Sequence, residues 1–384
     1  MAENKMVDAS KFITTMKATS TPEVAEIWGR IEEYYNKKLW HQLTIELRTL
    51  VKLPSMQEGT KLISLYNDFI SDFESRLNPL TLVQMAMVVL DRFEKADEGQ
   101  EFIERIGEKV KQHNEAFALT KILVGKIKLH KHDLRREAQN IIEEVDKMLA
   151  EFDGVSPVHS HFYLLSSDLY RIEGKHADFY RSSLRFLGCT DYEELSSVEQ
   201  AKHAFFLSLA ALLGEGVYNF GELLAHKILG SLKGTENDWL IDLLFAFNSG
   251  DVAKFRQLKP KWATQADLAA NETLLFEKVC LLCLMEMSFR REATQRIISF
   301  KEIAEETTLP VDQVELLTMK ALSQSLVKGK IDQVNATVHI TWVQPRVLNK
   351  DQVKIMLNKI DIWSASVTKM EKQIEMNAGE ILTY

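Results

Sequence analysis

The period-two alternation of apolar and polar residues that marks β-strands is almost absent from this chain before residue 326. Proline, which removes a hydrogen-bond donor and clashes inside a helix, occurs only seven times, and none lies between Pro157 and Pro260. Where proline does occur it suits a helix start, as at Pro79, which follows the potential capping residue Asn78. The first three quarters of the chain are therefore predicted to be α-helical.

A pattern of helix, short polar turn and second helix recurs weakly along this region. The turns are His132-Asp133, Gly174-Lys175, Asn219-Phe220 and Gly250-Asp251. The helix after the second turn carries an apolar face that includes Phe179, Tyr180 and Phe186. Because a helix pair cannot bury such a face alone, we predict that successive pairs stack into a helical-repeat solenoid over residues 21–296. A globular helical domain without true repeats is the alternative.

The pattern changes over residues 297–346. An amphipathic helix beginning near Phe300 is followed by a second helix with helical apolar spacing. Two alternating runs come next, Val327–Ile331 and Val338–Trp342, and residues 333–336 connect them as a hairpin. Two helices followed by a two-stranded wing predict a winged-helix module.

Residues 347–384 are predicted to contain a C-terminal helix with a narrow apolar stripe. The stripe, hereafter the seam, consists of Val353, Met356, Ile360, Trp363, Val367, Met370 and Ile374. Alternating intervals of three and four residues keep such a stripe facing a partner helix over several turns. We predict that the seam forms an interface with another subunit. The alternative is that the helix folds back onto the chain's own core, for which a broader stripe is typical.

The winged-helix segment lacks the charge of a nucleic-acid-binding module. It contains five Lys or Arg and six Asp or Glu, and the whole chain has a formal net charge of -8. Its second helix, the potential recognition helix, offers Asp312, Gln313, Glu315 and Thr318, with Lys320 as its only cation. Since phosphate contacts require basic side chains, we predict a protein-facing winged helix and no nucleic-acid partner.

Cys280 and Cys283 have C-x2-C spacing but lie in a long apolar helical run. A structural zinc ion normally takes four ligands. The chain has no second cysteine pair, and no histidine lies within fifty residues of this one. We therefore predict two buried free thiols.

His159 and His161 begin a pattern similar to the metal-binding motif of zinc isopeptidases, H-x-H followed after seven residues by S-x2-D. In that register the serine and aspartate positions hold Leu169 and Ile172, whose side chains have no metal-binding atom. The histidines are instead predicted in the first turn of a helix after Pro157. Nucleotide-binding loops and hydrolase motifs are also missing from the sequence. We predict that the chain is not an enzyme and binds no cofactor, metal ion or small molecule.

Cysteine content and hydropathy indicate the compartment. Three cysteines, an odd number, do not form a disulfide framework and favour a reducing environment. The first residues lack the apolar core of a signal peptide, and the longest nearly apolar stretch, residues 205–213, is too short to span a bilayer. We predict a cytoplasmic and nuclear protein with no membrane partner.

A basic cluster surrounds the turn at Asp133. It consists of Lys126, Lys128, Lys131, Arg135 and Arg136. Such a cluster could meet an acidic partner, although a solvated edge of a helix pair is the usual meaning of a charge run.

A helical-repeat body, a winged helix and a terminal helix together resemble the PCI-domain scaffold proteins, and most closely those of the proteasome lid. The segments that carry the resemblance are KKLWHQLT (37–44), LLGEGVYNFGELL (212–224), WLIDLLFAFNSGDV (239–252), LCLMEMSF (282–289), VELLTMKALSQSLVKGKID (314–332) and TWVQPRVL (341–348). The similarity covers nearly the whole chain, apart from a variable N-terminal segment, residues 1–20, and the tail.

The resemblance implies a mainly α fold: a right-handed, TPR-like solenoid, a winged-helix (PCI) module and a C-terminal bundle helix. It also implies a non-catalytic scaffold of the 19S regulatory particle lid in ubiquitin-dependent protein degradation, with other PCI lid subunits as partners. In that family, winged helices associate laterally and C-terminal helices gather in a common bundle. A PCI subunit of a signalosome or of a translation-initiation-factor complex is the alternative.

Overall fold

The computed structural model describes residues 9–19, 22–53, 55–56, 60–93, 95–291, 295–347 and 350–378. The chain divides into two compact units, one ending at Asp191 and one beginning at Tyr192. Parts of the predicted segments 1–20 and 347–384 lie outside the described residues, and the domain boundaries predicted after residues 20, 296 and 346 stay predictions.

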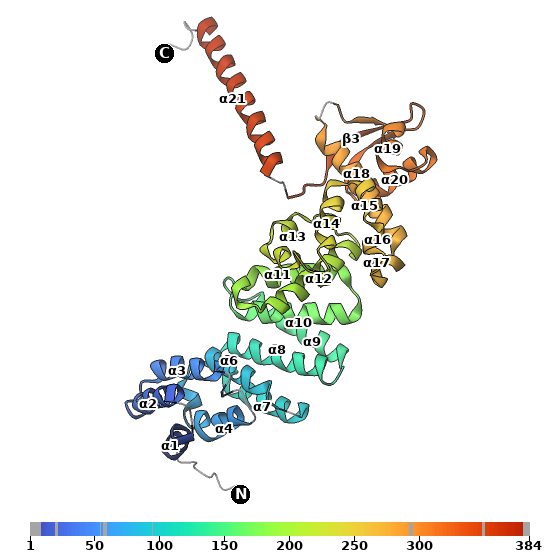
Figure 1. Ribbon diagram of the computed structural model, residues 1–384. Coiled ribbons are helices and arrows are strands. Elements are labelled where there is room, and N and C mark those ends of the chain that lie inside the picture. Colours follow the sequence, from blue (N-terminus) through green and yellow to red (C-terminus); the bar gives the residue numbers. More distant parts are fainter. Residues whose placement is uncertain are drawn as a thin grey trace. The chain divides into compact units, whose positions relative to one another are not determined.

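The described part of the first unit is entirely helical (Figure 1). Its elements are α1 (Ala9–Thr19), α2 (Pro22–Asn36), α3 (Trp40–Lys52), α4 (Lys61–Leu65), the π-helical η1 (Tyr66–Ile70), α5 (Ser71–Phe73), the 3₁₀ turn η2 (Glu74–Arg76), α6 (Pro79–Leu90), α7 (Ala96–Val110), α8 (Asn114–His130), α9 (Arg135–Leu149), α10 (Val158–Glu173) and α11 (His176–Cys189).

Local sequence signals set several of these helix ends. The Asn78 side chain accepts hydrogen bonds from the backbone amides of Leu80 and Thr81, at 3.0 and 3.3 Å, and Pro79 begins α6 as predicted. Gly174 adopts the left-handed conformation, with a φ of 73°, and ends α10. The predicted turns at 132–133 and 174–175 thus separate α8 from α9 and α10 from α11.

Helices of the first unit pack in chain order. Consecutive helices contact each other from α7 through to α11, which is the last helix of this unit. Helix α8 also contacts α6 and α10. Contacts to the first and second neighbour are typical of stacked helix pairs. The prediction of a mainly α chain with a helical-repeat region is confirmed, whereas the right-handed, TPR-like geometry stays a prediction.

The second unit contains helices and one small sheet. Its elements are η3 (Tyr192–Glu194), α12 (Ser197–Leu213), α13 (Gly221–Ala225), η4 (Lys227–Leu232), α14 (Trp239–Ser249), α15 (Val252–Gln257), α16 (Lys259–Trp262), α17 (Ala266–Ala270), α18 (Glu272–Arg290), β1 (Ile297–Ser299), α19 (Phe300–Thr307), α20 (Val311–Ser323), β2 (Val327–Asp332), β3 (Thr337–Val343) and α21 (Lys350–Ala378).

Repeats are less regular in this unit. The predicted turns at 219–220 and 250–251 lead into α13 and α15, which have only five and six residues. Helices this short depend on tertiary packing. Trp262 illustrates this packing, because it is fully buried and stacks on Phe255 with the ring centroids 5.1 Å apart. Its indole N–H donates a hydrogen bond to the Phe255 carbonyl oxygen.

The winged-helix module contains the two predicted helices, α19 and α20, and the predicted hairpin, β2 and β3. A Ser299–Glu302 capping box begins α19. The prediction of a two-stranded wing was incomplete, because β1 pairs antiparallel with β3 and the sheet has the order β1-β3-β2. Ile298, opposite Val338, is buried between the sheet and the helices. A strand of three residues is too short to show alternation in the sequence.

Candidate assembly surface

The seam is uncovered in the structure. Its seven side chains are between 47% and 70% exposed, with Met356 the least and Trp363 the most exposed. Every described side chain of α21 is exposed. The alternative that α21 completes the chain's own core therefore finds no support among the described residues.

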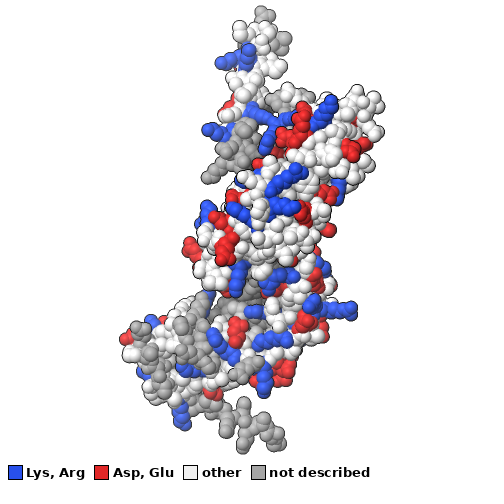
Figure 2. Space-filling view, turned by 45° about the vertical axis from the view of Figure 1, so that its right-hand side comes forward, with Lys and Arg blue, Asp and Glu red and all other residues white. Residues whose placement is uncertain are grey.

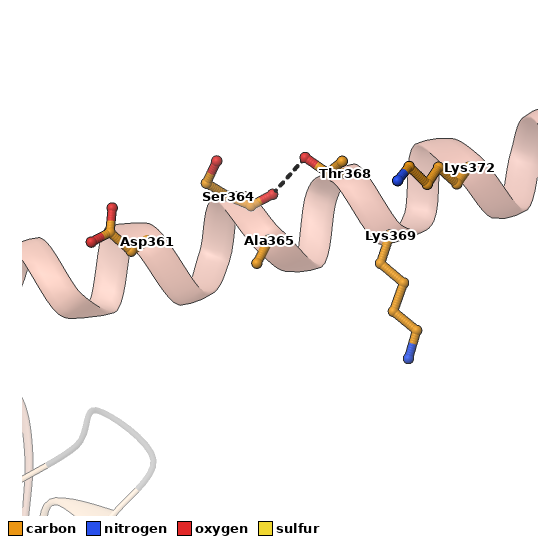
Figure 3. A pocket seen from close by; sticks show the side chains of 6 residues that line it. All are labelled: Asp361, Ser364, Ala365, Thr368, Lys369 and Lys372. Carbon is orange, nitrogen blue, oxygen red and sulfur yellow. Dashed lines mark hydrogen bonds between the residues drawn. The ribbon is translucent and has the colours of Figure 1, made fainter.

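The opposite side of α21 is polar. A shallow hollow there is lined by Asp361, Ser364, Ala365, Thr368, Lys369 and Lys372 (Figure 3). All six residues belong to one helix, and the only hydrogen bond drawn joins the Thr368 hydroxyl to the Ser364 carbonyl oxygen, at 3.1 Å. A hollow with a single wall is not a ligand cavity. Its lining shows that α21 has one apolar and one polar face.

Among the described side chains of α21, three further large apolar ones are exposed outside the seam. Leu357, which follows Met356, widens the apolar stripe near the start of the helix. Ile362 and Met376, at 69% and 85% exposed, lie away from the seam. The apolar stripe of α21 is thus broader than predicted only near the start of the helix.

The winged helix presents a second apolar surface. Val311, Leu316 and Met319 on α20 are 48%, 67% and 53% exposed, while Val314 on the same helix faces the core. We call Val311, Leu316 and Met319 the α20 patch. Apolar side chains thus stand where a nucleic-acid reader would carry cations.

Two polar residues of α20 have partners within the chain. Thr318 was predicted to be offered to a partner, but it is fully buried and its hydroxyl donates to the Val314 carbonyl oxygen at 2.8 Å. Lys320, the only cation of α20, forms an ion pair with Glu277 of α18. Figure 2 shows Lys and Arg intermingled with Asp and Glu over the face it draws, without a broad basic field.

Three members of the basic cluster near Asp133 have local partners, and two of these partners are carboxylates. Lys128 pairs with Glu137 at 2.8 Å, and Arg135 pairs with Asp133 at 3.0 Å. Lys131 donates to the carbonyl oxygen of Phe93. These contacts are typical of a solvated helix-pair edge.

Cys280 and Cys283 are free and buried, as predicted. Burial raises the pKa of each thiol to about 12. His159 and His161 lie in the first turn of α10, also as predicted, and burial lowers the pKa of His161. Within the described ranges, no group of three or more His, Cys, Asp or Glu side chains could hold a metal ion. Nor does any helix there combine the length and apolar character needed to cross a membrane.

Arg346, four residues before the start of α21, is a candidate positioning residue that the sequence did not reveal. Only 10% of its side chain is exposed, and it pairs with Glu286 of α18. In the sequence it is one of five cations in the winged-helix segment. Its position in TWVQPRVL, the segment that joins the wing to the final helix, was the available signal.

Comparison with known proteins identifies the family. A family model described as PSD13 N-terminal repeats matches residues 27–244, more than half of the chain. The chain is 38% identical to 26S proteasome non-ATPase regulatory subunit 13 homolog B of Arabidopsis thaliana, over 94% of this chain and 96% of the relative. The chain belongs to the proteasome regulatory subunit 13 family. Regulatory subunit 13 of Dictyostelium discoideum is 36% identical, over 94% of this chain and 95% of the relative.

Proteins of the alternative complexes are more distant from this subunit 13 family member. Eukaryotic translation initiation factor 3 subunit M of Phaeosphaeria nodorum is 25% identical over 63% of this chain. COP9 signalosome complex subunit 7 of Dictyostelium discoideum is 27% identical over 42%. Both identity and coverage therefore favour the proteasome subunits, and the predicted resemblance to PCI lid proteins is confirmed.

The PCI domain model matches residues 254–342 of this subunit 13 family member. This range includes the three-stranded sheet up to Trp342 and both helices of the winged-helix module. It ends before α21, so the seam lies outside both matched family models. The interface role of the seam stays a prediction that rests on its spacing and exposure.

Proposed function

We propose that this protein is a non-catalytic scaffold subunit of the proteasome 19S regulatory particle lid, acting in ubiquitin-dependent protein degradation. Its partners are other PCI lid subunits, and it assembles through the seam and the winged helix. Family membership supports the complex, and the uncovered seam supports the mode of assembly.

The exposure of the seam is the observation that carries this proposal. Burying one large aliphatic or aromatic side chain stabilises a protein or complex by about 1.5–3 kcal/mol. Seven such side chains on one face of α21 thus offer a driving force of several kcal/mol once a partner helix covers them. Within the described part of the chain, no residue covers the seam to realise this gain.

The α20 patch supports a second contact. A winged helix that bound nucleic acid would need cations on this helix, but Leu316 and Met319 are exposed and Lys320 is paired. An apolar surface bordered by polar residues favours a protein partner.

The non-catalytic role is supported by the residues at the isopeptidase register. Leu169 is buried, and Ile172 packs against the core of the first unit. Neither side chain can bind a metal ion, so isopeptidase activity would belong to another subunit. We place the protein in the cytoplasm and nucleus, because its free cysteines suit a reducing compartment.

Truncation tests the proposal. Deleting residues 349–384 should leave a folded protein that is incorporated poorly into lid particles on native gels. Deleting only residues 379–384, beyond α21, is the matched control and should leave incorporation unchanged. Normal incorporation of the longer deletion would contradict the docking role. Mass spectrometry of co-purified proteins separates the lid from a signalosome or a translation-initiation-factor complex.

A further inference from the structure

Residues 344–347, hereafter the strap, connect β3 with the segment that leads to α21. The backbone amide of Gln344 donates to the Leu326 carbonyl oxygen at 2.8 Å. This bond continues the pairing of β2 with β3 by one residue. The amide of Val347 donates to the Asn219 side-chain oxygen at 3.4 Å. The strap is therefore held at both ends, and α21 begins three residues beyond it, at Lys350.

Arg346 holds the middle of the strap. One guanidinium nitrogen donates to the Asn248 carbonyl oxygen at 3.1 Å, and another pairs with Glu286. The Asn248 carbonyl lies in the last turn of α14, where carbonyl groups lack partners within the helix and a cation is favourable. Glu286 is 11% exposed and also accepts from Arg290, whose side chain is 65% exposed. Arg346 is thus the buried partner of Glu286, and Arg290 is the solvent-facing one.

The strap also passes very close to the start of α13. A Cβ atom added to Gly221 would lie 2.3 Å from the Cβ of Val347, so only glycine leaves room for the strap. The Asn219 side-chain oxygen accepts from the Gly221 amide at 3.2 Å as well as from Val347. One side chain therefore joins the first turn of α13 to the strap.

We propose that Asn219, Glu286 and Arg346 form a clasp that fixes the point from which α21 leaves the second unit. Arg346 is the positioning residue for the docking of the seam. The inference rests on the proposed function, since it concerns how the same helix is presented to its partner. A helix tethered at a fixed point loses less freedom on association than one on a loose strap, so the clasp strengthens binding without touching the partner.

Two measurements on the full-length chain test the clasp. The first is amide hydrogen exchange, in the isolated protein, of Gln344 and Val347, whose backbone amides are hydrogen-bonded. Exchange should become about tenfold faster in Arg346→Gln and in Asn219→Ala. In each variant the strap can open without first breaking a clasp contact, so the open state is more populated. The second is the concentration needed for half-maximal incorporation into lid particles that lack this subunit. It should rise by about tenfold in both variants.

Asn219→Ala leaves the Arg346–Glu286 ion pair intact, so it tests the clasp even where Arg346→Gln perturbs folding. The matched control is Arg290→Gln, which removes the exposed partner of Glu286 and makes no strap contact among the described residues. It should leave both measurements unchanged.

Unchanged exchange in both clasp variants would show that the clasp does not hold the strap. Faster exchange with normal incorporation would show that it does not position the helix. The seam variant Ile360→Asp/Val367→Asp separates these results from a failure of the proposed function. If that variant is incorporated normally, the seam is not the docking surface, while hydrogen exchange still reports on the clasp.

Discussion

The ammonium group of Lys278 on α18 donates a hydrogen bond of 2.8 Å to the carbonyl oxygen of Gly214, at the end of α12. The same group donates to the carbonyl oxygens of Ala211 and Leu212, at 2.8 and 3.0 Å. Only 4% of Lys278 is exposed. Three carbonyl groups that α12 cannot satisfy internally thus share one buried cation from a distant helix.

The pH dependence of stability should report on Lys278. Burial lowers the pKa of Lys278 from 10.5 to about 7. Between these values the unfolded chain binds more protons than the folded chain, so this group makes the protein more stable as the pH rises from 7 towards 10. Wild type should gain up to about 1.4 kcal/mol per pH unit relative to Lys278→Met.

Melting temperatures of the two proteins at pH 7, 8 and 9 measure this difference. The difference between the two melting temperatures should change by about 2 °C per pH unit, in favour of wild type at higher pH. A difference in melting temperature that does not vary with pH would mean that the hydrogen bonds to three carbonyl oxygens keep Lys278 charged.

Charges placed in the seam should abolish assembly without unfolding the protein. In Ile360→Asp/Val367→Asp both substituted side chains are already exposed, so the melting temperature should change by no more than about 2 °C. Incorporation into lid particles should be lost, because an apolar interface would have to bury two unpaired carboxylates. Ser364→Asp/Thr368→Asp adds the same charges to the polar face in Figure 3 and should assemble normally. Equal behaviour of the two double variants would refute the seam as interface.

The three thiols should differ in reactivity. Burial raises the pKa of all three thiols, to about 12 for Cys280 and Cys283, but Cys189 at the end of α11 is only partly buried. A thiol reagent at pH 8 should therefore label one cysteine quickly in the native protein and all three after denaturation. Cys189→Ser should remove the fast phase, and the purified protein should contain no stoichiometric zinc. A native protein with zinc bound to Cys280 and Cys283 would contradict the buried-thiol assignment.

Alanine substitutions at three glycines should distinguish the cost of backbone strain from the cost of a steric clash. Gly250 has a φ of 65°, and an added Cβ would lie 2.6 Å from the Cα of Cys283 in α18. Gly174 has a φ of 73° but open space around an added Cβ, and Gly188 has open space within α11 and no positive φ. Gly174→Ala should cost about 1–2 kcal/mol from left-handed strain alone. Gly250→Ala should cost more, and Gly188→Ala should stabilise the protein by about 0.5 kcal/mol. Urea denaturation of the three variants gives the order, and equal losses for Gly174→Ala and Gly250→Ala would argue against close packing of α14 on α18.

The full-length chain should not bind double-stranded DNA. Proteins with non-specific DNA affinity bind with dissociation constants of about 10⁻⁴–10⁻⁶ M at physiological salt. Gel shifts with about 10 µM protein should therefore show free probe, at low as well as physiological salt. A complex that weakens steeply with added salt would reinstate the nucleic-acid hypothesis for the winged helix.

Local features of the fold were predictable from the sequence. Asn78 and Pro79 mark the start of α6, Gly174 marks the end of α10, and the hairpin of β2 and β3 follows from alternation. The strand β1 was not predictable in this way, because its three residues become a strand only by pairing with β3. Thr318 could have been placed correctly, since it lies four residues after Val314 on the apolar face of α20.

The sequence by itself determined that this protein carries a helix with an apolar seam and a winged helix without a basic face. Both properties are local, because residue spacing and charge are the same in any fold. Only the tertiary structure decided that Arg346 belongs to a clasp, since its partners Asn248 and Glu286 lie 98 and 60 residues away in the chain. It also decided that Lys278 donates hydrogen bonds to the end of α12, where Gly214 lies 64 residues away in the chain. Contacts over such separations depend on which helices pack together, and no local pattern records that.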